Sequence, residues 1–450
     1  MFTNKLKFVN NLFTFSPCIS FPPIEYIATG GDFMLERINS VLCGILLPCA
    51  VFAVGVFFTI KVRGFYILHP IKSMRRALKA SGGFRPLCVA LAGTLGVGNI
   101  VGVASAITVG GAGAVFWMIF SAFVAMGVKY AETHLAIAHR RNGAQGHFGG
   151  APYYIADSFK KRRHGVLFGS VFAILCVVNS LSTGNLVQIN SIIPVLSGKA
   201  LVWGFLIAVA VALIVRGGQG RIESVCAVII PTLTVLYVIL SFFIIFCNFG
   251  GLCVAISSIF KSAFSLKNAI SGIGGFGILS AIRYGFSRGL LSNEAGCGTS
   301  PTAHASSPAD PVSQGCLGVF EVFWDTVVLC TLTALVILIS GENATDPITL
   351  AINAYGAFLG NFGRIFISTS CVIFALATLV CQFYYGICAL RFISSSRAIK
   401  FAYSVIFLAV CVLSSIISNG VMWSISDFIV CALAIYNMVF LIKMAKEVSI

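Results

Sequence analysis

Stretches of apolar residues that approach 20 residues in length recur along the whole chain, and they constrain its fold more than any other feature. A helix needs about 20 predominantly apolar residues to cross the hydrocarbon core of a bilayer. With 58% hydrophobic and only 10% charged residues, the chain is also too apolar for a water-soluble globule. The sequence therefore predicts an all-α polytopic membrane protein with about eleven membrane-spanning helices, at about residues 41–60, 87–109, 114–138, 166–197, 200–215, 225–247, 268–290, 315–340, 364–392, 401–418 and 421–442.

Basic residues lie mainly between these helices, on one side of the predicted membrane. Seven of them follow the first helix and six follow the third, namely Lys61, Arg63, Lys72, Arg75, Arg76, Lys79, Arg85, Arg140, Arg141, Lys160, Lys161, Arg162 and Arg163. Cytoplasmic loops carry such an excess, so we predict a cell-membrane protein with its N-terminus outside and its C-terminus in the cytoplasm. Dispersed charge of this kind predicts the lipid bilayer as partner, with no nucleic acid and no obligate protein partner.

Glycines interrupt two of the apolar stretches in a similar way. The second stretch contains GTLGVGNIVGVASAI at residues 93–107, and the seventh contains SGIGGFGILSA at residues 271–281. Non-helical backbone persists at bilayer depth only where it lines a cavity or a site. Paired breaks of this kind are typical of transporters whose substrate lies near the middle of the membrane. Glycines that merely let helices pack closely are the alternative.

The position of the breaks predicts two related units within one domain. We expect a transmembrane domain at residues 39–450, with a first repeat at about 87–247 and a second, inverted repeat at about 268–442. The helix at 41–60 is then an addition to this five-plus-five arrangement. Residues 1–38 are expected to be a disordered N-terminal segment or to precede the true start at Met34.

Carboxylates inside apolar stretches are costly and therefore informative. Glu321 and Asp325 are four residues apart, so both project from one helix face and need a cation or a donor nearby. They are candidates for coupling or gating, with hydrogen bonding to neighbouring helices as the alternative. Glu132 follows Lys129 by one turn, which favours a structural ion pair, whereas Asp427 has no obvious local partner.

Other classes of membrane protein fit less well. The six histidines are dispersed, and neither an HExxH nor a GxSxG motif is present, so we predict that the chain is not an enzyme. The sixteen cysteines form no CxxC pair and are interpreted as small apolar packing residues, so no cofactor is expected. A channel would favour rings of like residues rather than paired broken helices.

Several polar blocks closely resemble the alanine or glycine:cation symporter family, also called the sodium:alanine symporter family. They are GTLGVGNIVGVASAITVGGAGAVFWM from Gly93, KYAETHLAIAHR from Lys129, GGAPYYI from Gly149, SNEAGCGTSPTAHASS from Ser292 and the 31 residues from Pro311 to Gly341. The resemblance covers nearly the whole chain after about residue 35. It implies a LeuT-like five-plus-five inverted repeat with an extra first helix. It also implies sodium-coupled import of alanine or glycine.

A small zwitterion needs backbone N–H donors for its carboxylate and oxygen acceptors for its ammonium group, and broken helices supply both. The half-helix that begins near Asn99 offers free N–H groups and a positive dipole end. The resemblance adds Gln188 as a side chain that touches the substrate, with an interhelical hydrogen bond as the alternative. The candidate substrate-binding residues are Gly96, Gly98, Asn99, Gln188, Gly274, Gly275, Phe276, Gly277 and Gln382.

Sodium prefers a cage of oxygen atoms, for which Thr94, Asn99 and Thr378 are the candidates. Members of the family that this chain resembles carry an adjacent Ser-Thr pair and then a Trp ahead of a Tyr-Tyr-Gly. Here the segment reads ATLVCQFYYG, so Ala377 replaces the serine and Gln382 replaces the tryptophan. One oxygen ligand is therefore missing, which leaves sodium or a proton as the coupling ion. The smaller Gln382 predicts a roomier pocket that also accepts substrates larger than alanine.

Overall fold

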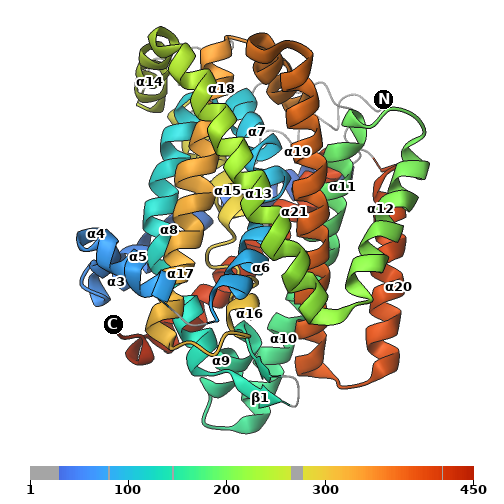
Figure 1. Cartoon of the computed structure of the whole chain (residues 1–450). Helices are drawn as coiled ribbons and strands as arrows, with labels where there is room; N and C mark the ends of the chain where they lie inside the picture. The colour runs from blue at the N-terminus through green and yellow to red at the C-terminus, as the bar shows by residue number, and fades with distance from the viewer. Residues whose placement is uncertain (1–29, 80–81, 144–145, 265–276, 418) are drawn as a thin grey trace, which may run out of the picture.

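Helices make up nearly all the regular structure of this computed structural model, which describes residues 30–79, 82–143, 146–264, 277–417 and 419–450 (Figure 1). Eight helical runs in this part of the chain are long and apolar enough to cross a membrane, and four shorter helices are also apolar. A bilayer core offers backbone groups no water, so apolar segments satisfy their N–H and C=O groups internally as helices. The prediction of an all-α polytopic membrane protein is confirmed.

The elements of the first half precede the second candidate break. In chain order they are α2 (Gly30–Val41), η1 (Leu42–Leu46), α3 (Leu47–Lys61), α4 (Phe65–Leu68), α5 (Pro70–Lys79), α6 (Phe84–Thr94), η2 (Val97–Asn99), α7 (Val101–Gly110), α8 (Gly113–Ala138), β1 (Arg141–Gly143), β2 (Gly146–Phe148), α9 (Ala151–Asp157), α10 (Arg162–Leu181), η3 (Ser182–Leu186), α11 (Val187–Ile192), η4 (Ile193–Val195), α12 (Ala200–Val215), α13 (Gly218–Cys247) and α14 (Phe249–Ala263). Strands β1 and β2 pair antiparallel as a short hairpin, with Asn142 opposite His147.

Within its described residues, the regular elements of the second half are all helices. Its elements are α15 (Ile278–Asn293), α16 (Pro301–His304), α17 (Pro311–Val322), η6 (Phe323–Cys330), α18 (Thr331–Ser340), α19 (Pro347–Ile393), α20 (Arg397–Ser414), α21 (Asn419–Lys443) and η7 (Ala445–Glu447). The predicted stretches coincide with helices in both halves. Gly274, Gly275 and Phe276 lie outside the described residues, so the second candidate break is described only from Gly277 onward. The division into two inverted repeats stays a prediction.

Three helices depart from the predicted boundaries. Helix α2 begins at Gly30, inside the N-terminal segment that was expected to be disordered. Helix α19 begins 17 residues earlier than expected, because Asp346 caps its start and Gly360 then takes a left-handed conformation (φ 58°) that joins two helical parts across a kink. Helix α14 lies in a segment that we had expected to be a loop. It has 15 residues, and its length is below that of a spanning helix.

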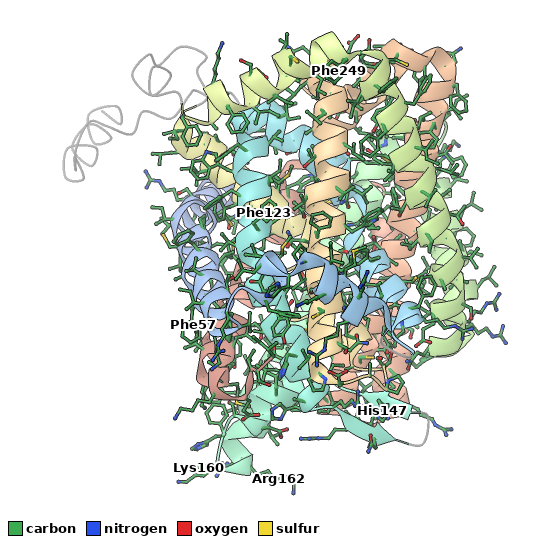
Figure 2. The ribbon with its side chains drawn as sticks, turned by 60° about the vertical axis from the view of Figure 1, so that its left-hand side comes forward. Phe57, Phe123, His147, Lys160, Arg162 and Phe249 are labelled. Atoms are coloured by element: carbon green, nitrogen blue, oxygen red, sulfur yellow. The ribbon has the colours of Figure 1, made fainter. Side chains whose placement is uncertain are left out.

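Apolar side chains cover the outside of the bundle, as expected for a lipid-facing surface. Phe57 and Phe123 are 43% and 44% exposed and project outward in Figure 2. The same view places Phe249 at one end of the molecule, and Lys160 and Arg162 at the other. Polar residues gather inside instead, where neighbouring helices supply their hydrogen-bond partners.

A polar cluster outside the membrane-spanning helices holds the C-terminal segment in place. His139, just after α8, donates to Asp157 at 2.9 Å and to Glu447 at 2.8 Å, and Arg141 donates to Asp157 at 2.6 Å. Burial lowers the pKa of His139, but its two hydrogen bonds to carboxylates raise this pKa above its ordinary value of 6.5. Burial raises the pKa of Asp157, whereas His139 and Arg141 lower it to a net value below the ordinary 3.8.

This cluster makes thermal stability depend on pH. The raised pKa of His139 gives a stabilising contribution that is complete below the pKa of the unfolded chain and is lost as pH rises through the folded pKa. The contribution of Asp157 is present above its unfolded pKa and is lost as pH falls through its folded pKa. We therefore expect the melting temperature in detergent to fall as pH rises from about 6.5, the ordinary pKa of histidine, through the higher folded pKa of His139. The fall should shrink in His139→Gln and persist in His147→Gln, and equal slopes in both variants would contradict this role.

Candidate functional site

The predicted break in the second apolar stretch is present and is held open by two other helices. Helix α6 ends at Thr94, Gly96 is extended (φ −108°, ψ −151°), and α7 begins only at Val101. The backbone N–H of Val97 donates to Oε1 of Gln188 on α11 at 3.1 Å. The break therefore has a backbone donor that no helix satisfies, and a side chain from α11 accepts from it.

Position 96 requires glycine because the side chains of Gln188 and Thr378 approach its backbone closely. A Cβ atom there would lie 2.7 Å from Oε1 of Gln188 and 2.7 Å from Oγ1 of Thr378. The structure thus brings three predicted site residues together from α6–α7, α11 and α19. Gln188 contacts the break itself, whereas its neighbour Asn185 makes the interhelical bond, donating to the carbonyl of Phe407 at 2.9 Å.

The two threonines of the predicted sodium set lie on either side of Gly96. Thr378 donates to the carbonyl of Ala92 at 2.9 Å and to that of Phe374, in its own helix, at 3.0 Å. Thr94 makes only long bonds of 3.3 Å to carbonyls of its own helix. Each hydroxyl uses its hydrogen in these bonds and keeps oxygen lone pairs for another partner. Both side chains are buried.

Asn99 points away from the threonines, toward Asp325. Its amide nitrogen donates to Oδ1 of Asp325 at 2.8 Å and to the Asp325 carbonyl at 3.1 Å. Ser292 and Thr326 donate to Oδ2 of the same carboxylate, each at 2.7 Å. Asp325 lies in the π-helical segment η6, and such segments often occur at functional sites. Oδ1 of Asn99 is buried and has no hydrogen-bond partner within the described residues.

Two other glycines of the predicted site, Gly98 and Gly277, make fewer close contacts than Gly96 does. A Cβ atom at Gly98 would lie 3.2 Å from Cα of Ser292, so Gly98 packs against the end of α15. A Cβ atom at Gly277 would meet no atom of the described residues within 4 Å, and Gly277 precedes α15 with an extended ψ of 155°. The site is therefore described fully on the side of the first break and only in part on the side of the second.

Glu321 and Asp325 turn to different partners although they are four residues apart. Glu321 lies 3.2 Å from Nζ of Lys129 and 3.0 Å from Nε2 of His304. Lys129 also lies 3.5 Å from Glu132 of its own helix α8, so the predicted ion pair is present and is shared with Glu321 of a second helix, α17. Glu132 in turn accepts backbone N–H groups of the turn that follows α15, from Gly296 and Gly298, at 3.1 Å each.

Asp427, which has no local partner in the sequence, binds Arg288 of α15. The guanidinium Nη1 lies 2.9 Å from Oδ1 of Asp427 and its Cζ lies 4.6 Å from the ring centre of Trp423. This pair ties α15 to α21. The distance of 2.9 Å between Arg288 and Asp427 is typical of a charge-assisted hydrogen bond.

Glu294 is a buried carboxylate that the sequence analysis missed as a site residue. Its Oε1 accepts from Nε2 of Gln382 at 2.7 Å and its Oε2 accepts from Thr299 at 2.5 Å. Its backbone is left-handed (φ 49°), a conformation that non-glycine residues adopt rarely and mostly where the surroundings enforce it. The Ser-Asn-Glu-Ala-Gly block was the available signal, because it places a carboxylate between two apolar helices.

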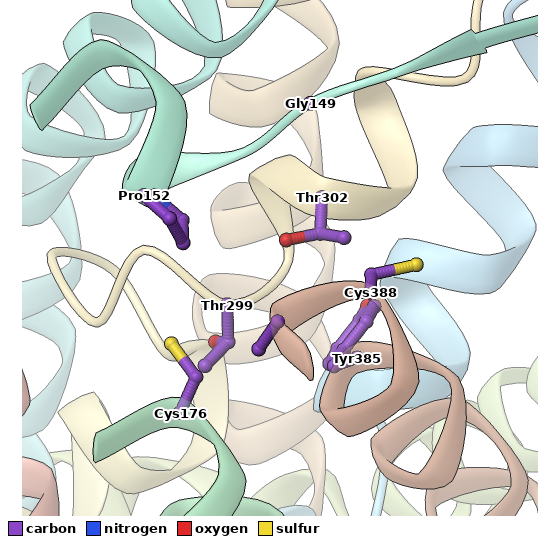
Figure 3. A pocket seen from close by; sticks show the side chains of 8 residues that line it. Gly149, Pro152, Cys176, Thr299, Thr302, Tyr385 and Cys388 are labelled. Carbon is purple, nitrogen blue, oxygen red and sulfur yellow. The ribbon is translucent and has the colours of Figure 1, made fainter. Parts of the chain in front are cut away.

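A pocket lies beside this turn, among α9, α10, α16 and α19. Figure 3 shows Thr299 and Thr302 on one side of it and Tyr385 and Cys388 on another. Its lining residues are Gly149, Pro152, Cys176, Thr299, Thr302, Tyr385, Cys388 and Ala389. The pocket is therefore one hydrogen bond away from Glu294, through Thr299.

An all-α polytopic bundle with a broken helix, around which buried polar side chains converge, defines a membrane transporter. The family model for the sodium:alanine symporter family matches residues 29–450. The chain belongs to this family.

Relatives align over nearly their whole length. The sodium/alanine symporter AgcS of Methanococcus maripaludis is 31% identical over 92% of this chain and 95% of its own. The uncharacterized transporter YflA of Bacillus subtilis is 32% identical over 92% and 91%. The probable sodium/glutamine symporter GlnT of Bacillus subtilis is 29% identical over 91% and 87%.

Solved structures share the fold at low identity. A manganese transporter of Eremococcus coleocola, in complex with an aromatic bis-isothiourea substituted compound, aligns with a TM-score of 0.51. The alignment covers 80% of this chain and 76% of the transporter, at 14% identity. This likeness concerns the fold alone.

Proposed function

We propose that the protein imports small neutral amino acids, namely glycine and either enantiomer of alanine, by alternating access, driven by a sodium gradient. The convergence of Gln188 and Thr378 on Gly96 carries the proposal, because it builds a buried polar site at a helix break. N–H groups at the start of α7 suit the carboxylate of the substrate, and the carbonyl groups at the end of α6 suit its ammonium group. The names of AgcS and GlnT support amino-acid transport with sodium.

We propose that the hydroxyl oxygens of Thr94 and Thr378 bind sodium at the break. Asn99, the third predicted ligand, binds Asp325 instead, although its Oδ1 has no hydrogen-bond partner within the described residues. Ala377, buried beside Thr378, adds no oxygen where the family pattern has a serine. We propose that the basic end of the molecule, with Lys160 and Arg162, faces the cytoplasm of a cell-membrane protein (Figure 2).

Substitutions in α19 test the sodium site. Uptake of labelled glycine into proteoliposomes under an imposed sodium gradient should collapse in Thr378→Ala, because one oxygen ligand of about five is lost. Ala377→Ser should lower the sodium concentration for half-maximal uptake, because it restores a hydroxyl beside Thr378. Wild-type uptake that ignores sodium and follows pH would defeat the sodium proposal.

A proton-coupled permease with broader specificity is the second candidate, and two features of α19 favour it. Ala377 removes a sodium ligand, and Gln382 binds the carboxylate of Glu294 instead of presenting a bulky ring. Glu321 and Asp325 are further candidates for coupling or gating.

Competition by serine or valine, present in wild type and lost in Gln382→Trp, would show that residue 382 sets the size of the pocket, and unchanged competition would show that it does not. One extra methylene is worth about 1–3 kcal/mol in an apolar pocket.

A further inference from the structure

Glu294 differs from the neighbouring buried carboxylates in its partners. Glu132 and Glu321 each lie within 3.5 Å of Nζ of Lys129, and Glu321 also contacts His304. The Glu294 carboxylate instead accepts from two neutral donors, Gln382 and Thr299. No cation within the described part of the chain makes an ion pair with it.

The charges of this region do not balance when all three glutamates are ionised. Lys129 is one cation among three buried carboxylates, and its contacts go to Glu132 and Glu321. The two ring nitrogens of His304 lie near oxygen atoms of Gln314 and Glu321. A positive charge on this ring would therefore neutralise Glu321 and not Glu294. An ionised Glu294 then has no ion-pair partner within the described residues although the residue is only 4% exposed, and a buried charge without such a partner is costly.

Gln382 is able to bind either form of this carboxyl group. Its Nε2 donates to Glu294 at 2.7 Å, as suits a carboxylate. Its Oε1 is buried and has no hydrogen-bond partner among the residues that the structure describes, and Gln382 is 1% exposed. A half-turn of the amide exchanges the two atoms and presents an acceptor to a protonated Glu294. Gln382 packs closely against Gly184, where a Cβ atom would lie 2.6 Å from Cβ and Cγ of Gln382. The half-turn needs little added space, because it exchanges two terminal atoms of similar size.

Titratable groups face Glu294 from every element packed around it. Lys129 and Glu132 come from α8, Glu321 from α17 and His304 from α16. The remaining groups are thiols or a phenol, namely Cys176, Cys297, Cys381 and Tyr385. Among these acidic groups, Glu294 is the carboxyl group whose partners are neutral.

One face of α19 links this carboxyl group with the helix break and with the pocket. Thr378 lies at the break, Gln382 follows one turn later, and Tyr385 lines the pocket one turn further on. Thr299 lines the same pocket and donates to Glu294. A proton on Glu294 is therefore placed between the candidate substrate site and a pocket toward the end of the molecule that carries the β1–β2 hairpin (Figures 1 and 3).

We propose that Glu294 and Gln382 form a proton-binding site, and that this proton moves with the substrate in each transport cycle. This inference rests on the proposed amino-acid transport and adds a proton to sodium as the second coupling ion. In the loading step, an O–H bond to Glu294 forms as an O–H bond of hydronium breaks, and Oε1 of Gln382 accepts the new hydrogen bond. In the release step, the proton returns to water through the pocket, and Nε2 of Gln382 donates again to the carboxylate.

The test measures protons and glycine in the same proteoliposomes, which contain a trapped pH indicator. An inward glycine gradient is imposed at equal pH and equal sodium on both sides, and acidification of the lumen is divided by labelled glycine taken up. The ratio corrects for any loss of folded carrier. We expect wild type to acidify the lumen, and we expect Glu294→Gln and Gln382→Met to take up glycine with no acidification.

Glu223→Gln is the matched control. Glu223 also accepts from a glutamine, Gln219 at 2.8 Å, but at the partly exposed start of α13. Its ratio of protons to glycine should equal that of wild type. Wild-type glycine uptake without acidification overturns the inference and leaves the proposed function intact, whereas absence of any glycine uptake defeats the proposed function. Acidification that persists in Gln382→Met also overturns the inference, even if Glu294→Gln does not fold.

Discussion

Gly96→Ala is expected to abolish amino-acid binding, because the added methyl group has no room at the helix break. It would lie 2.7 Å from both Oε1 of Gln188 and Oγ1 of Thr378, and both side chains are buried. Moving Gln188 away leaves the N–H of Val97 without its acceptor. An unsatisfied buried donor costs about 1–3 kcal/mol, which corresponds to about a tenfold or larger loss of affinity.

Gly220→Ala is the control for this prediction. Gly220 is exposed near the start of α13, and a Cβ atom there has no neighbour within 4 Å among the described residues. Binding of labelled glycine to purified protein should therefore be close to wild type in Gly220→Ala and lost in Gly96→Ala, at equal yields of folded protein. If Gly96→Ala binds as wild type does, the break is a packing feature and not the substrate site.

Lys129→Met is expected to produce the largest loss of stability. Its ammonium group lies 3.2 Å from Glu321 and 3.5 Å from Glu132, and all three side chains are fully buried. Removing the cation leaves two carboxylates facing each other in a dry interior, and breaking a buried pair in this way costs about 3–5 kcal/mol. The melting temperature in detergent should fall accordingly.

A double variant separates this electrostatic effect from a loss of packing. Lys129→Met with Glu321→Gln removes one of the orphaned charges, so it should melt above Lys129→Met alone. The exposed Lys261 of α14 serves as a control, since Lys261→Met should not change the melting temperature measurably. A Lys129→Met protein as stable as wild type would show that the cluster titrates to a neutral state without its lysine.

Several features of the fold follow from local properties of the chain. Apolar length predicted the helices, because a segment that enters the bilayer must satisfy its own backbone. The run from Gly93 to Asn99 predicted the break before α7, because glycines there allow extended backbone. Helix α14 and the early start of α19 were missed, since a short apolar helix and a capped, kinked one carry weak periodic signals.

The partners within the site were decided by tertiary structure alone. Gln382 and Glu294 are 88 positions apart, and Asn99 and Asp325 are 226 apart, so no local pattern joins them. The i,i+3 spacing did reveal Lys129 with Glu132, yet the sharing of that lysine with Glu321 required the packing of α17 on α8. Glu294 was passed over because its burial results from the turn that folds back between helices. Sequence determined which segments are helical and where one helix breaks, because hydrophobicity and backbone freedom are local properties of the chain. Tertiary structure decided which polar groups meet, because helix packing brings together residues that are far apart in the sequence.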